Sequence, residues 1–320
     1  MSMRTARSVW AAALAAAIGI SASPAGLTQA DASCDRACLQ GFADQYLEAL
    51  VAHDPSKAPL AENLKSTENG QEIRPGDGLW IGASANSKYR LYIADPATQQ
   101  VAFIGAIQEH GLPVLIALRL KVAGGKITES ENIVSRVNPG GLGKPENFTT
   151  PHPLFTTALP PAKRTPRDQM IKIADSYFTG LDTEESGRNV PFDKRCQRRE
   201  NGTVTANNPD PKASPMARLG CKAQFDTGFS VIVTDVRERR FPIVDEERGL
   251  VYAVVFFDHR GNVESYGRPD GTVAPVDPRF RRPMTFMIGE LFQIESGRIR
   301  QIEAILQEVP YGMPSGWSEK

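Results

Sequence analysis

The chain has 320 residues, and its 37 Lys and Arg balance its 37 Asp and Glu. This neutral composition excludes the strongly positive surface by which proteins bind nucleic acids or acidic membranes, so we expect neither partner. Hydrophobic residues make up 41% of the chain, which is too many for a disordered protein and predicts a folded globular one.

Residues 1–32 have the pattern of a secretory signal peptide. Two arginines precede an apolar run that is too short to span a bilayer, and small residues form a cleavage site at the end of the segment. Acylation of Cys34, as in a lipoprotein, is a weaker alternative because Asp31 stands where an apolar residue is expected. We therefore predict a secreted or periplasmic mature chain that begins near Ser33 and has no membrane attachment after cleavage.

The chain contains four cysteines and four histidines. The cysteines fit an oxidising compartment, and three pairings are open to them. Cys34 and Cys38 are one helical turn apart, within bridging distance, and this pairing would leave Cys196 for Cys221. Metal binding is the rival interpretation, but none of the histidines lies in a ligand-like cluster. We expect structural disulfides, and neither a metal nor a cofactor.

Repeated motifs divide the rest of the chain into two copies. Ala-Asp-x-Tyr occurs early in each copy, and Glu-Asn-Gly follows at Glu68 and again at Glu200. Further along, Gly-Lys-Ile before Glu131 matches Gly-Arg-Ile before Glu303. The order of the motifs is the same in both copies, which indicates an internal duplication.

The duplication sets the expected domain boundaries. We predict a first domain at residues 33–136, a proline-rich extended linker at 137–165 and a second domain at 166–320. The distance between matching motifs grows by about 40 residues along the chain, so the second domain carries loop insertions.

Each copy opens with a predicted amphipathic helix, at residues 39–50 and 170–181, and continues in strands. Two of these strands are VLIALRLKV at 114–122 and LVYAVVFFDH at 250–259. The second is apolar on both faces, so both faces need a cover. We expect a helix on one face and the sheet of the other copy on the second.

Several longer stretches carry a family resemblance: TENGQEI and GLW in the first copy, and RRENG, RRFPIVDEERGLVYAVVFFDH, GRIRQIEAIL and PYGMPSGW in the second. In these the chain resembles a family of secreted bacterial and fungal proteins built from two SnoaL-like domains of the nuclear-transport-factor-2-like superfamily. The resemblance implies an α+β fold of two tandem cone-shaped domains, each with N-terminal helices packed on a curved antiparallel sheet.

The resemblance also implies where the chemistry lies. A cone of this kind encloses a cavity that suits a small apolar or aromatic molecule met by a few polar groups. Members that catalyse reactions usually do so without a cofactor, with a carboxylate, histidine or tyrosine as acid and base. The fold itself does not fix the function, because it also hosts plain ligand binders.

Ionisable residues at strand ends and turns are the candidate catalytic groups. Glu68 and Glu200 either precede the Asn-Gly turn of a hairpin or act as bases at the rim of a cavity, with Arg198 or Arg199 holding Glu200 ionised. The candidates are His259, Glu200, Asp245, Arg240 and Glu68.

Asp258 and His259 are adjacent, but consecutive strand residues point to opposite faces, so they cannot form a dyad in one pocket. We expect Asp258 to bond the backbone of the following turn, residues 260–262, and His259 to be an acid/base group or a structural histidine at the end of an apolar face. Asp245 belongs to the hairpin at the far end of the same strand.

The arginines before Asp245 are expected to form an ion-paired hairpin or a clamp for an anion or carbonyl. Strand alternation places Arg239 on the face of Arg237, and Arg240 on the face of Glu238.

Candidate substrate-binding residues are aromatic or cationic. Trp80 and Tyr89 either wall a pocket or belong to the core. Arg119, flanked by leucines, either holds Glu131 or lies between the two copies, and Trp317 is expected to anchor the C-terminal tail. The candidates are Trp80, Tyr89, Arg199, Tyr252 and Arg119.

Three functions are consistent with these observations. The first is a secreted, cofactor-independent enzyme with acid/base chemistry, a lyase, dehydratase or isomerase, including C–C cleavage of plant-derived aromatic compounds. The second is a non-catalytic carrier or sensor for a similar small molecule. The third is an interaction protein in which one copy is degenerate. Homo-oligomerisation is compatible with each of them.

Overall fold

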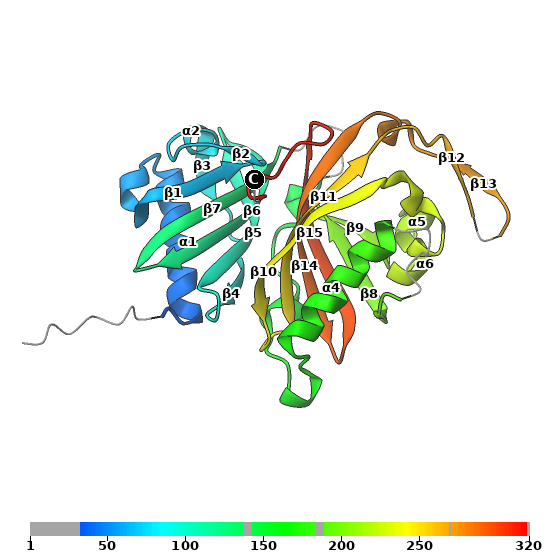
Figure 1. The fold of residues 1–320 in the computed structure, drawn as a ribbon, viewed down its shortest axis with the longest axis horizontal. Coiled ribbons are helices and arrows are strands. Elements are labelled where there is room, and N and C mark those ends of the chain that lie inside the picture. Colours follow the sequence, from blue (N-terminus) through cyan, green and yellow to red (C-terminus); the bar gives the residue numbers. More distant parts are fainter. Residues whose placement is uncertain (1–32, 137–142, 183–188, 269, 319–320) are drawn as a thin grey trace, which may run out of the picture. The chain divides into compact units, whose positions relative to one another are not determined.

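The computed structural model describes residues 33–136, 143–182, 189–268 and 270–318, and the predicted signal peptide lies outside them. Within these residues the protein is α+β, with many strands, few helices and two sheet-rich halves (Figure 1). Both halves belong to one compact unit, Ser33–Lys320.

In the first half, helix α1 (Arg36–Val51) covers one face of a seven-stranded sheet. The Asp35 side chain caps the helix by accepting a hydrogen bond from the backbone of Cys38. Apolar residues at helical spacing, such as Leu39 and Ala43, are buried against the sheet. The strand order is β2-β1-β7-β6-β5-β3, with β4 paired to β5. The elements are η1 (Pro55–Lys57), β1 (Leu60–Glu68), β2 (Gln71–Glu72), α2 (Leu79–Gly82), β3 (Ala83–Asn86), β4 (Leu91–Asp95), β5 (Gln100–Glu109), β6 (Leu112–Ala123) and β7 (Lys126–Ser135).

In the second half, helix α4 (Arg167–Asp182) covers a six-stranded sheet and lies across its strands in Figure 1. The sheet has the order β10-β11-β14-β15-β8-β9, and β12 and β13 form a separate hairpin. The elements are β8 (Phe192–Glu200), β9 (Thr203–Ala206), α5 (Pro215–Arg218), α6 (Cys221–Phe225), η4 (Phe229–Ile232), β10 (Asp235–Asp245), β11 (Leu250–His259), β12 (Ser265–Gly267), β13 (Val273–Pro275), η5 (Pro278–Phe280), β14 (Met284–Glu295) and β15 (Arg298–Val309).

The two halves repeat one arrangement of strands. In each half, the Glu-Asn-Gly motif connects the first strand to the last. The first strand of each half pairs in parallel with the last, β1 with β7 and β8 with β15. Asn69 and Asn201 begin two-residue hairpin turns with φ of 48° and 45°, as the Asn-Gly pairs predict. Each asparagine side chain also bonds the backbone N–H and C=O of the last strand, at Val134 and at Leu306. The motif therefore recurs because its asparagine connects the first and last strands of each sheet.

A third core fills the space between the two sheets. It contains Ile104 and Ala117 from the first sheet and Tyr252 and Phe256 from the second. Other residues of β11, such as Val255, pack on the opposite face, which α4 covers. Strand β11 is therefore buried on both faces, as its uniformly apolar sequence predicts.

A buried ion cluster also joins the two sheets. Arg119 Nε on β6 lies 2.8 Å from Glu131 Oε2, and Arg240 NH2 on β10 lies 2.5 Å from the other oxygen of the same carboxylate. Arg119 thus both holds Glu131 and lies between the two copies. The Trp317 ring lies 4.6 Å from the Arg119 guanidinium, and its indole N–H donates to Thr67 Oγ1 at 2.9 Å. The tail is anchored by Trp317, as expected.

The described part of the segment between the halves, residues 143–165, is folded. It forms three short helical turns, η2 (Pro145–Asn147), α3 (Pro153–Thr156) and η3 (Pro161–Lys163). Phe148 and Phe155 are buried in the core between the sheets. This corrects the expectation of an extended linker, because these prolines begin short helical turns that place two aromatic side chains in the core.

Candidate functional site

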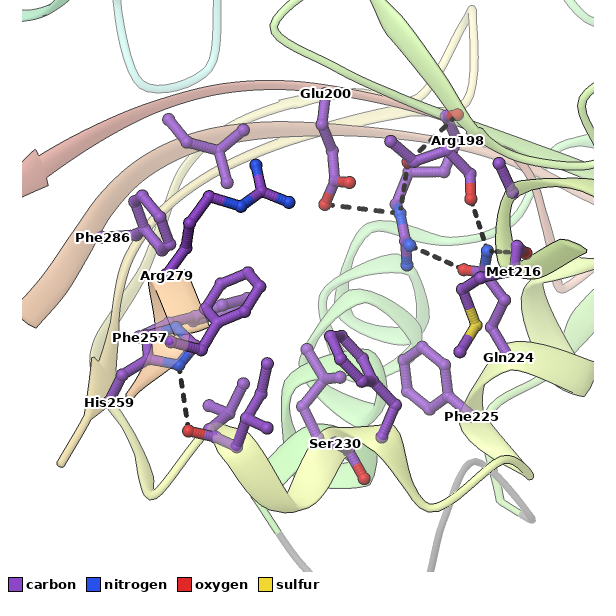
Figure 2. Close-up of a pocket in the computed structure, with 18 of the residues that line it drawn as sticks. Arg198, Glu200, Met216, Gln224, Phe225, Ser230, Phe257, His259, Arg279 and Phe286 are labelled. Carbon is purple, nitrogen blue, oxygen red and sulfur yellow. Dashed lines mark hydrogen bonds and ion pairs between the residues drawn. The ribbon is translucent and has the colours of Figure 1, made fainter. Parts of the chain in front are cut away.

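The second half contains a cavity of about 300 Å³ on the face of the sheet that α4 covers. Its wall is mostly apolar, and a few polar side chains from β8, α6, η4 and β11 interrupt it (Figure 2). A volume of this size suits a small molecule. The aromatic lining residues are Tyr177, Phe225, Phe229, Phe257, Phe280 and Phe286, and the polar ones are Arg198, Glu200, Thr205, Ser214, Gln224, Ser230, His259 and Arg279.

One row of residues across each sheet differs between the two halves beside this cavity. The row of the second half consists of Glu200, Ala304, Glu290 and Ala253 on neighbouring strands. The matching row of the first half consists of Glu68, Asn132, Leu118 and Phe103. Phe103 and Leu118 fill the helix-covered face of the first sheet. The second half has alanine where the first has Phe103, but of its row only Glu200 lines the cavity, whose wall also includes residues of α6 and η4.

At one end of the cavity, Arg198 organises the polar groups. Its Nε lies 3.4 Å from Glu200 Oε1, and its NH1 donates to Tyr177 Oη at 3.1 Å. Its NH2 donates to Gln224 Oε1 at 2.6 Å. Gln224 lies on α6, which the Cys196 disulfide ties to β8. These contacts, with a hydrogen bond from Nε to Thr205 Oγ1 at 3.1 Å, hold Arg198 beside the Glu200 carboxylate at the wall of the cavity.

His259 lines the cavity on a different side from Glu200 (Figure 2). Its Nδ1 lies 2.9 Å from the Ile232 carbonyl oxygen, which can only accept, so Nδ1 carries the proton. Burial lowers the pKa of His259 to about 4, so the ring is neutral at pH 7 and Nε2 is a free lone pair. Nε2 is buried and has no hydrogen-bond partner among the described residues. The ring packs against Phe280 and Phe286.

Glu290 lies in the same row as Glu200 and is completely buried. Burial, and secondly the negative charge of Glu200, raise the pKa of Glu290 to about 8, so this carboxyl is protonated at neutral pH. Its Oε2 has no hydrogen-bond partner among the described residues. Glu290 was not among the residues predicted from sequence.

Both disulfides left open by the sequence are formed, Cys34–Cys38 and Cys196–Cys221. The part of the chain that the structure describes contains no group of three or more His, Cys, Asp or Glu that could hold a metal ion. No helix in the described segments is long and apolar enough to cross a membrane.

Strand β10 departs from the predicted alternation. Its register with β11 shifts between Arg237 and Arg240, and Glu238 has φ of 53°, which is a β-bulge. Arg237 and Arg240 therefore share the face toward the first half, and Arg239 lies on the helix-covered face, where it binds Asp182 at 2.8 Å. The prediction that Arg239 and Arg237 share one face of the strand is wrong, because the bulge adds one residue between them.

Asp258 and His259 point to opposite faces, as predicted. Asp258 is buried and accepts hydrogen bonds from Arg237 at 2.9 Å and from Thr285 Oγ1. It therefore bonds side chains of neighbouring strands, which corrects the expected bond to the turn backbone.

Asp245 lies at the far end of β11 from His259 and outside the cavity, paired with Leu250. It forms ion pairs with Arg36 and with Arg248 at 2.7 Å. The arginines predicted to accompany it bind other carboxylates. Asp245 is thus part of a structural ion cluster, because its carboxylate and the side chains of Arg36 and Arg248 meet at this hairpin.

The other predicted site residues also lie outside this cavity. Glu68 accepts a hydrogen bond from the Leu79 backbone at 2.8 Å and binds Arg136. Trp80 packs edge-on against Tyr46 in the first core, at 5.2 Å between ring centroids. The small α2 helix places Trp80 there, so it closes the core of the first half.

Tyr89, Arg199 and Tyr252 occupy the space between the sheets, as do Arg119 and Arg240. Tyr89 stacks edge-on with Phe148 at 5.0 Å. Arg199 NH2 lies 2.6 Å from Glu303 Oε2, and Tyr252 is buried in the core between the sheets. The residues on strands face the other sheet because strand alternation turns them away from the helix that covers their own sheet.

Comparison with known proteins places the chain in a family. A family model described as a domain of unknown function, DUF8021, matches residues 32–134 and 163–306. The chain belongs to this family. The two matched segments coincide with the two sheet-rich halves.

Two solved structures are similar to parts of this DUF8021 chain. A protein from Sphaerobacter thermophilus is 19% identical, with 30% of this chain and 94% of that chain covered and a TM-score of 0.25. A de novo designed protein with a curved β-sheet is 12% identical, with 45% and 88% covered and a TM-score of 0.25. Among curated proteins, no sequence matches the chain.

Sequence reasoning about this DUF8021 chain found Glu200 and His259 but missed Glu290 and Gln224. A signal for Glu290 was present, because it is a single charge inside the apolar strand MTFMIGELFQI. The same kind of signal had identified Arg119. Gln224 carried no such signal, since it lies in a loop insertion that the repeat does not predict.

Proposed function

We propose that this protein is a cofactor-independent enzyme that carries out acid/base chemistry on a small apolar or aromatic molecule in the second-half cavity. Lyase, dehydratase and isomerase reactions belong to this class, including C–C cleavage of plant-derived aromatics. The observation that supports it is an apolar cavity of about 300 Å³ with Glu200 and His259 on its wall. The proposal includes a tandem SnoaL-like, cone-shaped architecture for the two halves.

The roles follow from the state of each group. Glu200, fixed by Arg198, is a carboxylate that can take a proton from a bound molecule. His259 is neutral and offers Nε2 as an acceptor for a hydroxyl or other donor of the ligand. Phenylalanine side chains around them make most of the wall apolar, which suits an apolar or aromatic ligand. This chemistry needs only side chains of the chain itself.

We propose a secreted or periplasmic location. The two disulfides support it, because such bonds persist in oxidising compartments.

The alternative is a carrier or sensor that binds the same kind of molecule without turnover. The ion pair between Glu200 and Arg198 favours it, because a carboxylate that already contacts a cation of the chain is occupied by a structural interaction.

The test uses the mature chain with two defined probes. N-phenyl-1-naphthylamine, a neutral aromatic fluorophore, reports occupation of the cavity. Proton abstraction is followed by ¹H NMR as loss of the α-proton signal of phenylacetone in D₂O. Glu200→Gln is expected to slow the exchange about 10²- to 10⁴-fold, the usual contribution of a positioned base, and to keep probe binding.

Glu68→Gln is the matched control, because Glu68 holds the same place in the first half and lies outside the cavity. It should leave both binding and exchange unchanged. Probe binding by the parent protein with exchange no faster than in buffer would favour the carrier. Absence of probe binding would contradict the assignment of the cavity.

A further inference from the structure

A buried carboxyl group lies beside the one that lines the cavity. Glu290 pairs with Ala304, and Ala304 pairs with Glu200, so the two glutamates lie on the same face of the sheet two strands apart. Neighbouring strands are about 4.8 Å apart, and only a methyl group separates the two side chains. Glu290 is 2% exposed and does not line the cavity.

We infer that Glu290 is a positioning residue. Its uncharged form leaves the Arg198–Glu200 ion pair intact, and its ionisation sets the alkaline limit of the reaction, the pH above which the rate falls. This inference rests on the proposed function. It assigns a role to the one charged residue of the row that the acid/base chemistry above does not use.

The groups that face Glu290 explain why its charge matters. From α4 comes Tyr177, and from β8 come Arg198 and Glu200, while β11 and β15 contribute alanines at this row. With Glu290 protonated, one cation faces one carboxylate, and the group is neutral. When Glu290 loses its proton, two carboxylates compete for Arg198. Glu200 is then no longer the only carboxylate that attracts this guanidinium, so its position at the wall is less well fixed.

The Arg198 guanidinium has little freedom to serve both carboxylates. It already donates to Tyr177 and to Gln224, at 3.1 and 2.6 Å. Burial places the pKa of Glu290 at about 8, so this change falls within an accessible pH range.

The first half supports the assignment by contrast. Its residue in the place of Glu290 is Leu118, which fits an apolar core without cost. A carboxyl in the same buried place is destabilising, because its Oε2 has no hydrogen-bond partner among the described residues. Its presence there points to a role other than stability.

The experiment compares the pH profile of phenylacetone exchange in the parent, Glu290→Gln and Glu290→Leu, after subtraction of buffer exchange. The parent rate should fall about fivefold between pH 8 and pH 9, as one group with a pKa of about 8 ionises. Both variants should keep their rate over this interval, because neither can ionise. Glu290→Leu introduces the residue that the first half has at this position. It provides the same comparison if the glutamine variant does not fold.

A second measurement is independent of turnover. Because the pKa of Glu290 in the folded protein lies above its ordinary value of 4.5, the folded chain holds a proton that the unfolded chain has lost between these values. The stability that depends on this proton is present at low pH and is lost as the pH rises toward 8. The melting temperature of the parent should therefore fall between pH 5 and pH 8 relative to that of the variants.

The outcomes separate the two proposals. Exchange by the parent with the same alkaline limb in all three proteins would overturn the role of Glu290 and leave the proposed function standing. Parallel melting curves over this pH range would also overturn it. No exchange by the parent at any pH would overturn the proposed function, and the role of Glu290 with it.

Discussion

The two halves of the molecule keep the same frame and differ in what they enclose. In both, an asparagine after the first strand bonds the last strand, and a buried tyrosine of the first helix lies over the sheet. The row that contains Glu68 belongs to the apolar core of the first half, whereas the row that contains Glu200 ends at a cavity in the second. The comparison teaches that shared hydrogen bonds preserve the architecture, while segments such as α6 and η4, which the first half, residues 33–136, lacks, supply part of the cavity wall.

The face between the sheets shows a second difference. Glu131 and Glu303 hold equivalent places in the two halves. Glu131 binds two arginines, Arg119 on its own sheet and Arg240 on the other, whereas Glu303 binds Arg199 on the adjacent strand. The two halves share the position of the carboxylate but differ in the position of the arginine that neutralises it. Arginines at several neighbouring positions of this buried face can neutralise the carboxylate.

The largest effect is expected from a test of the difference between Glu131 and Glu303. Glu131→Gln should lower the free energy of unfolding by about 3–5 kcal/mol, since it leaves the charges of Arg119 and Arg240 without this carboxylate. Glu303→Gln should cost less, because it affects one arginine. Urea denaturation of the two variants measures the difference, and equal losses would contradict the central role given to Glu131.

The disulfides provide the next test. Removal of Cys196–Cys221 with serines should cost about 3.5 kcal/mol, and removal of Cys34–Cys38 about 2 kcal/mol, because their sequence separations are 25 and 4. The first variant should also bind N-phenyl-1-naphthylamine more weakly, since that disulfide holds the helix of Gln224. Thermal unfolding and probe titration check both statements. Unchanged probe binding would show that α6 is placed by other contacts.

The smallest effect is expected when two second-half residues are replaced by those at the matching positions of the first half. Ala253→Phe with Glu290→Leu places the first-half side chains in the matching row of the second half. Ala253 is fully buried, so the larger side chain overpacks the core and should lower the free energy of unfolding by about 1–3 kcal/mol. Urea denaturation measures this loss, and an unchanged free energy of unfolding would contradict the close packing of this row.

Much of the fold could be predicted because it rests on local signals. The Asn-Gly turns, the two amphipathic helices and the doubly apolar strand β11 each follow from a few neighbouring residues. The faces of Arg239 and Arg240 could not be predicted, because a single bulge at Glu238 reverses the alternation and leaves no mark in the sequence.

The candidate site was predictable only in part, for the same reason. Glu200 and His259 belong to a repeated motif and to a strand end, and both lie at the cavity. Glu290 depends on strand register, which brings residues 90 positions apart into one row. Asp245 and Glu68 look equally suitable in the sequence, and it is the partners supplied by distant segments that make them structural.

The parallel pairing of first and last strands has a consequence for folding. In the first half the paired residues Ser66 and Ser130 are 64 positions apart, and in the second half Arg199 and Glu303 are 104 apart. Contacts between distant residues form slowly, because the intervening chain must lose its freedom first. We expect the first half to reach its native state sooner, and the ligand site to be among the last features to appear during refolding.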